Sequence, residues 1–287
     1  MTDSSAVWRS VKQSVRGGGN QRKLGAFLGV FTPSILTILG VILYLRTGWV
    51  VGSVGLVQAL LIVVIAHAVT LASALSISAV ATNMRVGKGG AYYIISRSLG
   101  IEVGAAIGIP LYLAMTFSVA LYAFGLAESV GYVWPDAPER PIAALTILAV
   151  ALLAARGAGV ALRLQLPIMA AIGLSLVILF IGIARSLPDS VDLATQVPDP
   201  VGFWAVFAVF FPAVTGIMAG ISLSGDLKNP ARSIPKGTIA AVLVGFVVYV
   251  IVTIALALAA SPRELVNDLA VGSHVLQVGA PQVLGVD

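Results

Sequence analysis

Hydrophobic residues fall into seven long runs separated by shorter polar stretches. The runs cover about residues 27–45, 54–81, 102–131, 141–155, 164–185, 202–222 and 236–260. Most are as long as the roughly 20 apolar residues that a helix needs to cross a bilayer, and the fourth is shorter. A transmembrane barrel would instead alternate in polarity over ~10-residue segments, a pattern that is absent here. The sequence therefore predicts an all-α polytopic membrane protein with seven spans.

Composition supports a membrane protein and excludes several other classes. Hydrophobic residues make up 59% of the chain and charged residues only 10%, against about 25% charged residues in soluble domains. Cysteine is absent, and the two histidines, His67 and His274, lie far apart in the sequence, so no metal cluster is expected. No H-E-x-x-H or other catalytic pattern is present. We therefore expect no enzyme activity and no cofactor.

The positive charges are distributed unevenly between the two sides of the membrane. With the N-terminus in the cytoplasm, 13 of the 17 Lys and Arg residues fall on the inner side, which satisfies the positive-inside rule. The outer side then holds only Arg46, Arg140, Arg185 and Arg263. This orientation predicts a multi-pass protein of the cell (plasma or inner) membrane. It also explains the net charge of +5 without nucleic acid as a partner. A seven-helix receptor would usually place its N-terminus outside.

The spans and charges divide the chain into three parts. Residues 1–24 are expected to form a flexible basic cytoplasmic tail, because they are polar and include the glycine run at 17–19. Residues 25–260 form the transmembrane core with helices 1–7. Residues 261–287 are expected outside the cell or in the periplasm, leading to an eighth helix that this chain lacks.

Proline and glycine interrupt two of the apolar runs. The first run, VFTPSILTILGVILYLR at 30–46, contains Pro33 and Gly40, and the sixth, FFPAVTGIMAG at 210–220, contains Pro212 and two glycines. Within a bilayer, freed backbone groups are tolerated only where protein or a wet cavity surrounds them. Freed carbonyls can bind a cation, and the amide groups that begin a half-helix can bind an anion. Two such helices five segments apart favour an inverted repeat with a midplane site; the alternative is two ordinary proline kinks.

Other polar groups within the runs allow more than one interpretation. Tyr122 could bind a cation or anchor its helix near the interface. Glu128 is interpreted as a hydrated surface carboxylate rather than an ion-path residue, and His67 as a hydrogen-bonded packing residue rather than a proton relay. The stretch 81–100 lacks the spacing of a phosphate-binding loop, so nucleotide binding is excluded. A cytoplasmic loop or a short re-entrant helix that could act as a gate is expected there.

Three stretches resemble the cation-chloride cotransporter family, within the amino acid–polyamine–organocation superfamily. They are ILGVILYLRTGWVVG at 38–52, SAVATNMRVGKGGAYYIISRSLGIEVGAAIG at 78–108, and FFPAVTGIMAG with SGDLKNPARSIPKGTI within 210–239. The resemblance implies a LeuT-like fold of inverted five-helix repeats with helices 1 and 6 interrupted. It also implies electroneutral symport of chloride with potassium, sodium or both, and it allows a homodimer of the full-length form.

The resemblance also implies which residues bind the ions. The cation would contact the carbonyls of Thr37, Ile38 and Pro212, the Thr215 hydroxyl and the Tyr122 phenol. One chloride would bind the amides of Gly40, Val41 and Ile42, and a second those of Gly216, Ile217 and Met218. An amino acid permease of the same superfamily is the alternative, with a carboxylate at the first set of amides and an amine at the carbonyls of the sixth segment.

This chain departs from the family pattern in several places. Thr37 replaces an asparagine that is common in animal members, and Leu39 replaces an aromatic residue, so cation affinity and stoichiometry are open. The chain stops before the helices that supply sodium-binding serines and a chloride-binding tyrosine. It is therefore expected to be the N-terminal part of a bacterial-type member, cut after about seven helices and inactive in transport by itself.

Overall fold

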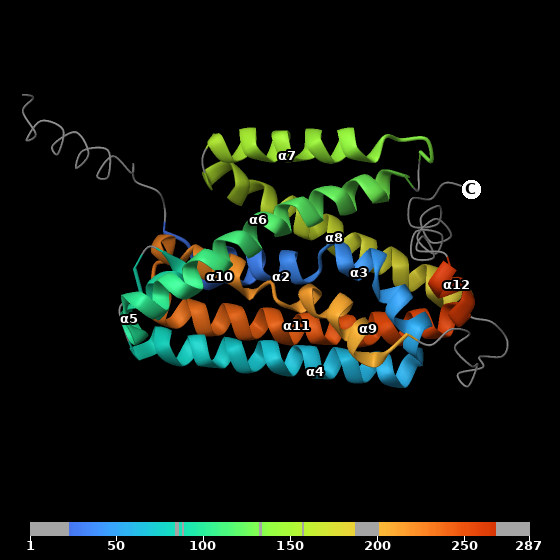
Figure 1. The fold of residues 1–287 in the computed structure, drawn as a ribbon, viewed down its shortest axis with the longest axis horizontal. Coiled ribbons are helices and arrows are strands. Elements are labelled where there is room, and N and C mark those ends of the chain that lie inside the picture. The colour runs from blue at the N-terminus through green and yellow to red at the C-terminus, as the bar shows by residue number, and fades with distance from the viewer. Residues whose placement is uncertain are drawn as a thin grey trace, which may run out of the picture.

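Figure 1 shows the fold in a computed structural model of the chain. The structure describes residues 23–83, 86–87, 89–131, 134–156, 158–186 and 201–267. Most of the predicted basic tail and the segment beyond residue 267 lie outside the described residues.

Helices account for nearly all of the described chain and run back and forth along one axis (Figure 1). The first and sixth spans are each built from several short pieces. The elements are η1 (Phe27–Phe31), α2 (Thr32–Ile38), α3 (Val41–Leu45), α4 (Thr47–Asn83), α5 (Gly90–Leu99), α6 (Ile101–Gly131), α7 (Glu139–Ala155), α8 (Ala158–Ser186), α9 (Phe203–Phe210), η2 (Phe211–Val214), α10 (Ile217–Ser222), η3 (Ser224–Asp226), α11 (Pro230–Ala259) and α12 (Pro262–Asn267).

The helices confirm the prediction of an all-α polytopic protein. Among the described residues, six stretches are long and apolar enough to cross a membrane: Phe27–Leu45, Thr47–Asn83, Ile101–Gly131, Leu162–Ala184, Phe203–Ser222 and Pro230–Ala259. The fourth predicted run, 141–155, is α7, which has only 17 residues. At 1.5 Å per residue this helix is about 26 Å long, slightly less than the ~30 Å hydrocarbon core.

The first span ends where the sequence predicts, whereas the second begins earlier than predicted. Helix α3 ends at Leu45, and backbone bonds then bridge Arg46, with its amide donating to the Ile42 carbonyl at 3.0 Å and the Val50 amide donating to the Arg46 carbonyl at 2.9 Å. Helix α4 starts at Thr47 rather than near residue 54, and it is kinked at Gly55, whose φ of 77° is a left-handed value that favours glycine. The short helical stretch before Gly55 therefore connects the first span to the second.

The buried core lies where α11 packs along α4 and against α2. Tyr249 of α11, Ile38 of α2 and Val63 of α4 are each exposed by 1% or less. In Figure 1, α4 and α11 run side by side below α2, whereas α6, α7 and α8 lie on the opposite side. Most side chains of α6 are exposed, and they are apolar, as expected for a surface that faces lipid or other helices.

Three glycines on different helices, Gly52, Gly108 and Gly220, allow close contacts with neighbouring elements. A Cβ on Gly52 would lie 2.8 Å from the Pro262 carbonyl oxygen beside α12. A Cβ on Gly108 would lie 2.9 Å from the Tyr92 ring of α5, and one on Gly220 would lie 2.6 Å from the Ser34 hydroxyl of α2. Each glycine therefore removes a side chain that would push two elements apart.

At one end of the bundle, the start of the described chain pairs with the segment that follows α10. The Leu24 amide donates to the Asp226 carbonyl at 2.8 Å, and the Lys228 amide donates to the Leu24 carbonyl at 2.8 Å. These two bonds form a parallel bridge between Leu24 and Leu227. The first span is thereby attached to the end of the sixth.

The polar stretch 81–100 forms a short helix at this same end. Helix α5 starts at Gly90, where a Cβ would lie 3.0 Å from Ser222 Cα at the end of α10. The Ser224 hydroxyl donates to the Gly87 carbonyl at 2.9 Å. The short helix expected in this stretch is therefore present and contacts the sixth span; its role as a gate stays a prediction.

The opposite end of the bundle is closed by α12, whose first turn is capped by its own side chains. The Glu264 carboxylate accepts hydrogen bonds of 2.8 Å from both the amide and the hydroxyl of Ser261. The backbone bond and then the hydroxyl bond lower the pKa of the Glu264 carboxyl, because both stabilise its charged form. The Glu264 amide also lies 3.4 Å from the Ser261 hydroxyl, which completes a capping box at the start of α12. Helix α12 packs against the first turns of α4, at Gly48 and Gly52.

Candidate functional site

The first span is broken at Leu39 and Gly40. The last bond of α2 runs from the Leu39 amide to Ile35 at 2.8 Å, after which Gly40 adopts extended backbone angles. The next helical bond runs from the Leu43 amide to the Gly40 carbonyl at 3.1 Å. The amides that begin α3 and the carbonyls that end α2 therefore have no partner within their own helix. These are the groups expected to bind an anion and a cation.

The sixth span is broken between Phe211 and Gly216. A 3₁₀ turn, η2, follows α9 and contains Pro212, whose carbonyl accepts from the Thr215 hydroxyl at 2.9 Å and from its amide at 3.4 Å. Helix α10 then begins at Ile217, with its first bond from the Ala219 amide to Gly216 at 3.3 Å. Two of the predicted cation ligands, Pro212 and Thr215, are thus hydrogen-bonded to each other and exposed at the surface of the chain.

The two breaks touch each other. The Thr37 hydroxyl oxygen lies 2.8 Å from the Gly216 carbonyl, 2.8 Å from that of Ser34 and 3.0 Å from that of Pro33. The single hydroxyl proton is shared among these three carbonyl acceptors. A Cβ on Gly216 would lie only 2.7 Å from Thr37 Cβ, so glycine is needed for this approach. The freed groups of both spans are therefore brought into one region.

Tyr122 of α6 faces the first break. A Cβ on Gly40 would lie 3.3 Å from Tyr122 Cε1 and 3.0 Å from the Thr37 carbonyl oxygen. The ring is 37% exposed and lies against the broken segment. From the sequence, Tyr122 could be either an interface anchor or a cation ligand. Its position beside the first break favours the role of a cation ligand.

Ile38 differs from the other predicted cation ligands. Its carbonyl accepts a hydrogen bond of 2.9 Å from the Tyr249 hydroxyl of α11, in a fully buried environment. The sequence did not single out Tyr249, because its bond goes to a backbone atom 211 residues away. In the sequence, the only indication of a role for Tyr249 was a polar hydroxyl in the middle of the apolar run 236–260.

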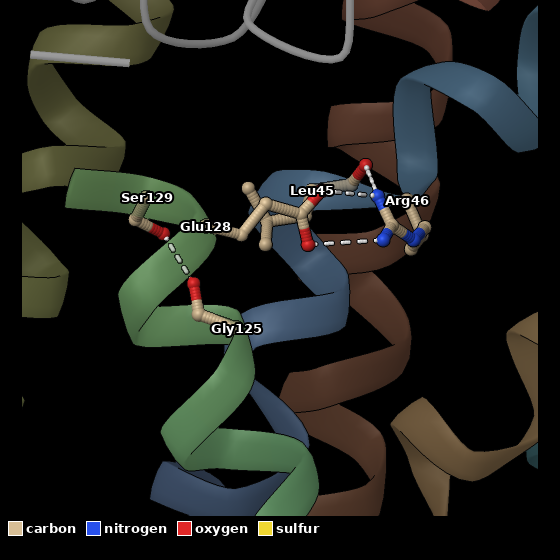
Figure 2. Close-up of polar contacts among 5 residues, drawn as sticks. All are labelled: Leu45, Arg46, Gly125, Glu128 and Ser129. Atoms are coloured by element: carbon tan, nitrogen blue, oxygen red, sulfur yellow. Dashed lines mark hydrogen bonds and ion pairs between the residues drawn. The ribbon is translucent and has the colours of Figure 1, made fainter. Parts of the chain in front are cut away.

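An ion pair lies beyond the first break, towards the α12 end. Figure 2 shows the Arg46 guanidinium donating to both carboxylate oxygens of Glu128, each at 3.0 Å. The side chains are 34% and 28% exposed, respectively. The favoured interpretation of Glu128 as a hydrated surface group was incomplete, because the carboxylate joins the first span to α6. Its partner could not be inferred from the sequence.

Removing the Thr37 hydroxyl is expected to weaken the contact between the two breaks. Thr37→Val keeps the shape of the side chain but leaves the Gly216 carbonyl without this donor, whereas Thr37→Ser keeps the donor. Loss of one such bond costs about 0.5–1.5 kcal/mol. We expect the melting temperature of the purified chain to fall by several degrees in Thr37→Val and clearly less in Thr37→Ser. Equal melting temperatures for the two variants would contradict a role for the hydroxyl.

The profile of the amino acid permease family matches residues 29–283 and includes both breaks. The chain belongs to the amino acid permease family. Permeases of this family have the LeuT-like fold, so the predicted arrangement of interrupted first and sixth helices is confirmed.

This permease-family chain is also similar to solute carriers and chloride cotransporters of animals. It is 34% identical to solute carrier family 12 member 9 of Danio rerio, over 88% of this chain and 34% of that protein. It is 36% identical to human solute carrier family 12 member 2, over 79% of this chain and 21% of that protein. A bumetanide-sensitive sodium-(potassium)-chloride cotransporter of Manduca sexta is 35% identical, over 81% of this chain and 25% of that protein.

These comparisons confirm the resemblance to the cation-chloride cotransporters within this permease family. The matches are to membrane transporters and not to enzymes, as the sequence predicted. The chain spans about a third or less of the length of these relatives.

Proposed function

We propose that this chain forms the core of a secondary transporter that moves chloride together with potassium, sodium or both. The observation that supports this best is the contact between the two breaks through Thr37 and Gly216. It brings freed carbonyls, which suit a monovalent cation, close to freed amides, which suit an anion. The name of the Manduca sexta relative points to the same substrates.

The proposed cation ligands are the carbonyls of Thr37, Ile38 and Pro212 with the hydroxyls of Thr215 and Tyr122. The proposed chloride ligands are the amides of Gly40 to Ile42 and of Gly216 to Met218, which begin α3 and α10. Electroneutral symport requires equal numbers of monovalent cations and chloride ions, so filling both chloride sites needs a second cation besides the one at these ligands.

Alternating access would then rock the two interrupted helices, together with their partner helices, against the rest of the bundle. We place the α5 end of the bundle at the cytoplasm and the α12 end outside the cell, because Lys23, Lys228 and Arg232 lie at the α5 end. This orientation puts the N-terminus inside the cell or plasma membrane. A homodimer of the full-length form is part of the same proposal.

The direct test is uptake of rubidium, a potassium substitute, into proteoliposomes containing the longest natural form that includes residues 1–287. We expect uptake to fall to the background level when gluconate replaces chloride, because both ions must bind before the helices move. Proteoliposomes without protein give the background. Rubidium uptake that does not respond to chloride would contradict symport.

A second candidate substrate is an amino acid, which is favoured by the name of the family whose profile matches. An amino acid carboxylate would occupy the amides of Gly40 to Ile42, and its amine the carbonyls of the sixth span. Uptake of radiolabelled amino acids in the same vesicles separates the two candidates. Saturable, chloride-independent amino acid uptake would favour the permease activity.

A further inference from the structure

Tyr249 supplies a hydrogen bond that the first break has removed from the helix. In an unbroken α-helix, the Ile38 carbonyl would accept from the amide four residues later, that of Ile42. The change of direction at Leu39 and Gly40 removes this donor. A buried carbonyl without a donor is costly, especially within a bilayer. The Tyr249 hydroxyl, at 2.9 Å from this carbonyl, takes the place of the lost amide.

Close packing from three helices fixes the position of this hydroxyl. The Tyr249 ring is fully buried and meets the ring of Phe210 from α9 edge-on, with centroids 5.2 Å apart. The imidazole of His67 from α4 lies on another side, with centroids 5.6 Å apart. One turn before Tyr249, Gly245 allows α11 to approach the break, because a Cβ there would lie 2.6 Å from Ile38 Cγ2. The hydroxyl therefore has little freedom to move.

His67 contributes to this packing as a neutral ring. Its Nδ1 lies 2.9 Å from the Val63 carbonyl, and because a carbonyl only accepts, Nδ1 carries the proton. The other nitrogen, Nε2, is buried and has no hydrogen-bond partner among the residues that the structure describes. The ring also meets Phe246 edge-on at 5.3 Å between centroids. These contacts match the predicted role of His67 as a hydrogen-bonded packing residue. Its ring packs against the Tyr249 ring and limits the movement of that side chain.

We propose that Tyr249 is a positioning residue for the candidate cation site. A carbonyl oxygen has two lone pairs, so the Ile38 oxygen can accept from Tyr249 and still offer a lone pair to a cation. Holding the carbonyl in one direction lowers the cost of ordering it when the ion binds. This inference rests on the proposed function, because it assigns the Ile38 carbonyl to a transported cation.

The test is Tyr249→Phe, which removes the hydroxyl and keeps the ring contacts with Phe210 and His67. We expect the KM for rubidium to rise by about 3- to 10-fold, the size of effect that follows from losing one hydrogen bond. The KM for chloride should change by less than about twofold, because the Tyr249 hydroxyl bonds to a proposed cation ligand, the Ile38 carbonyl, and not to the amides proposed for chloride. The assay uses proteoliposomes of the longest natural form that contains this chain.

Tyr112→Phe is the matched control. It also removes a tyrosine hydroxyl, from a side chain of α6 that is 72% exposed and is not among the proposed ligands. Its KM for rubidium should stay at the wild-type value. If Tyr249→Phe does not fold, Gly245→Ala provides a second variant, since its added methyl pushes α11 away from Ile38. It should raise the KM for rubidium in the same selective way.

The possible outcomes separate this inference from the proposed function. An unchanged KM for rubidium in Tyr249→Phe, with wild-type uptake still dependent on chloride, overturns the positioning role and leaves the symport proposal standing. Equal increases in both KM values indicate a general structural role and also overturn it. If wild-type uptake is independent of chloride, the symport proposal fails. A selective increase in the KM for rubidium would then still support the role of Tyr249.

Discussion

Replacing Gly216 with alanine is expected to reduce chloride-dependent rubidium uptake by about 10- to 100-fold, the equivalent of an overpacking cost of ~1–3 kcal/mol. A Cβ at this position would lie 2.7 Å from Thr37 Cβ and 2.9 Å from the Ile38 amide nitrogen. One of these neighbours is backbone at the first break, so the added methyl cannot be accommodated by a side-chain rotation. The two breaks would have to separate, and the freed groups of the two spans would no longer share one region.

Gly173→Ala is the matched control for this change. It makes the same substitution in α8, where a Cβ would meet nothing within 4 Å, and alanine favours a helix more than glycine does. Initial uptake rates of the two variants are compared at equal amounts of reconstituted protein. Wild-type uptake by Gly216→Ala would show that the close approach of the breaks is not required for transport.

Neutralising Glu128 is expected to lower uptake by about 10-fold. Glu128→Gln leaves the Arg46 guanidinium without the charge that it contacts through two 3.0 Å hydrogen bonds. Breaking a fully buried pair costs about 3–5 kcal/mol, but these side chains are roughly a third exposed, so solvent screening reduces the cost to about 1–2 kcal/mol. The pair joins the end of the first span to α6 at the α12 end, and its loss would weaken that connection.

A charge exchange tests this explanation more sharply than the single substitution. The double variant Arg46→Glu with Glu128→Arg restores the pair in reverse, and we expect it to recover part of the uptake that either single substitution loses. Glu139→Gln is the control, since it neutralises an exposed glutamate at the start of α7 at the same end of the bundle. Additive losses in the double variant would show that the two side chains act independently.

Hydropathy predicted the helical spans and the end of the first span at Leu45, but it placed the start of the second span too late. Helix α4 already starts at Thr47 and is kinked at Gly55. This residue is one of 30 glycines, and its positive φ could not be distinguished in advance. The partner of Arg46 was also hidden, because Glu128 lies 82 residues later in the sequence.

The interrupted spans were predicted from proline and glycine, but the two residue types act differently here. Pro33 directly follows the π-helical turn η1 in a continuous helix, and the break occurs later, at Leu39 and Gly40. In the sixth span, Pro212 lies within the broken segment itself. The sequence could therefore locate both breaks, whereas the contact of Thr37 with Gly216 required the fold, because it joins residues 179 positions apart.

The bridge between Leu24 and Leu227 has a mechanical consequence when it is taken together with the Thr37–Gly216 contact. Hydrogen bonds join the first and sixth spans at the α5 end and near the middle of the bundle, where the Ser34 hydroxyl also donates to the Ile217 carbonyl at 3.4 Å. A single joint would allow either helix to swivel about the other, but two separated joints remove that degree of freedom. The segments between these contacts, η1 and α2 of the first span and α10 of the sixth, are therefore expected to move together as one rigid unit.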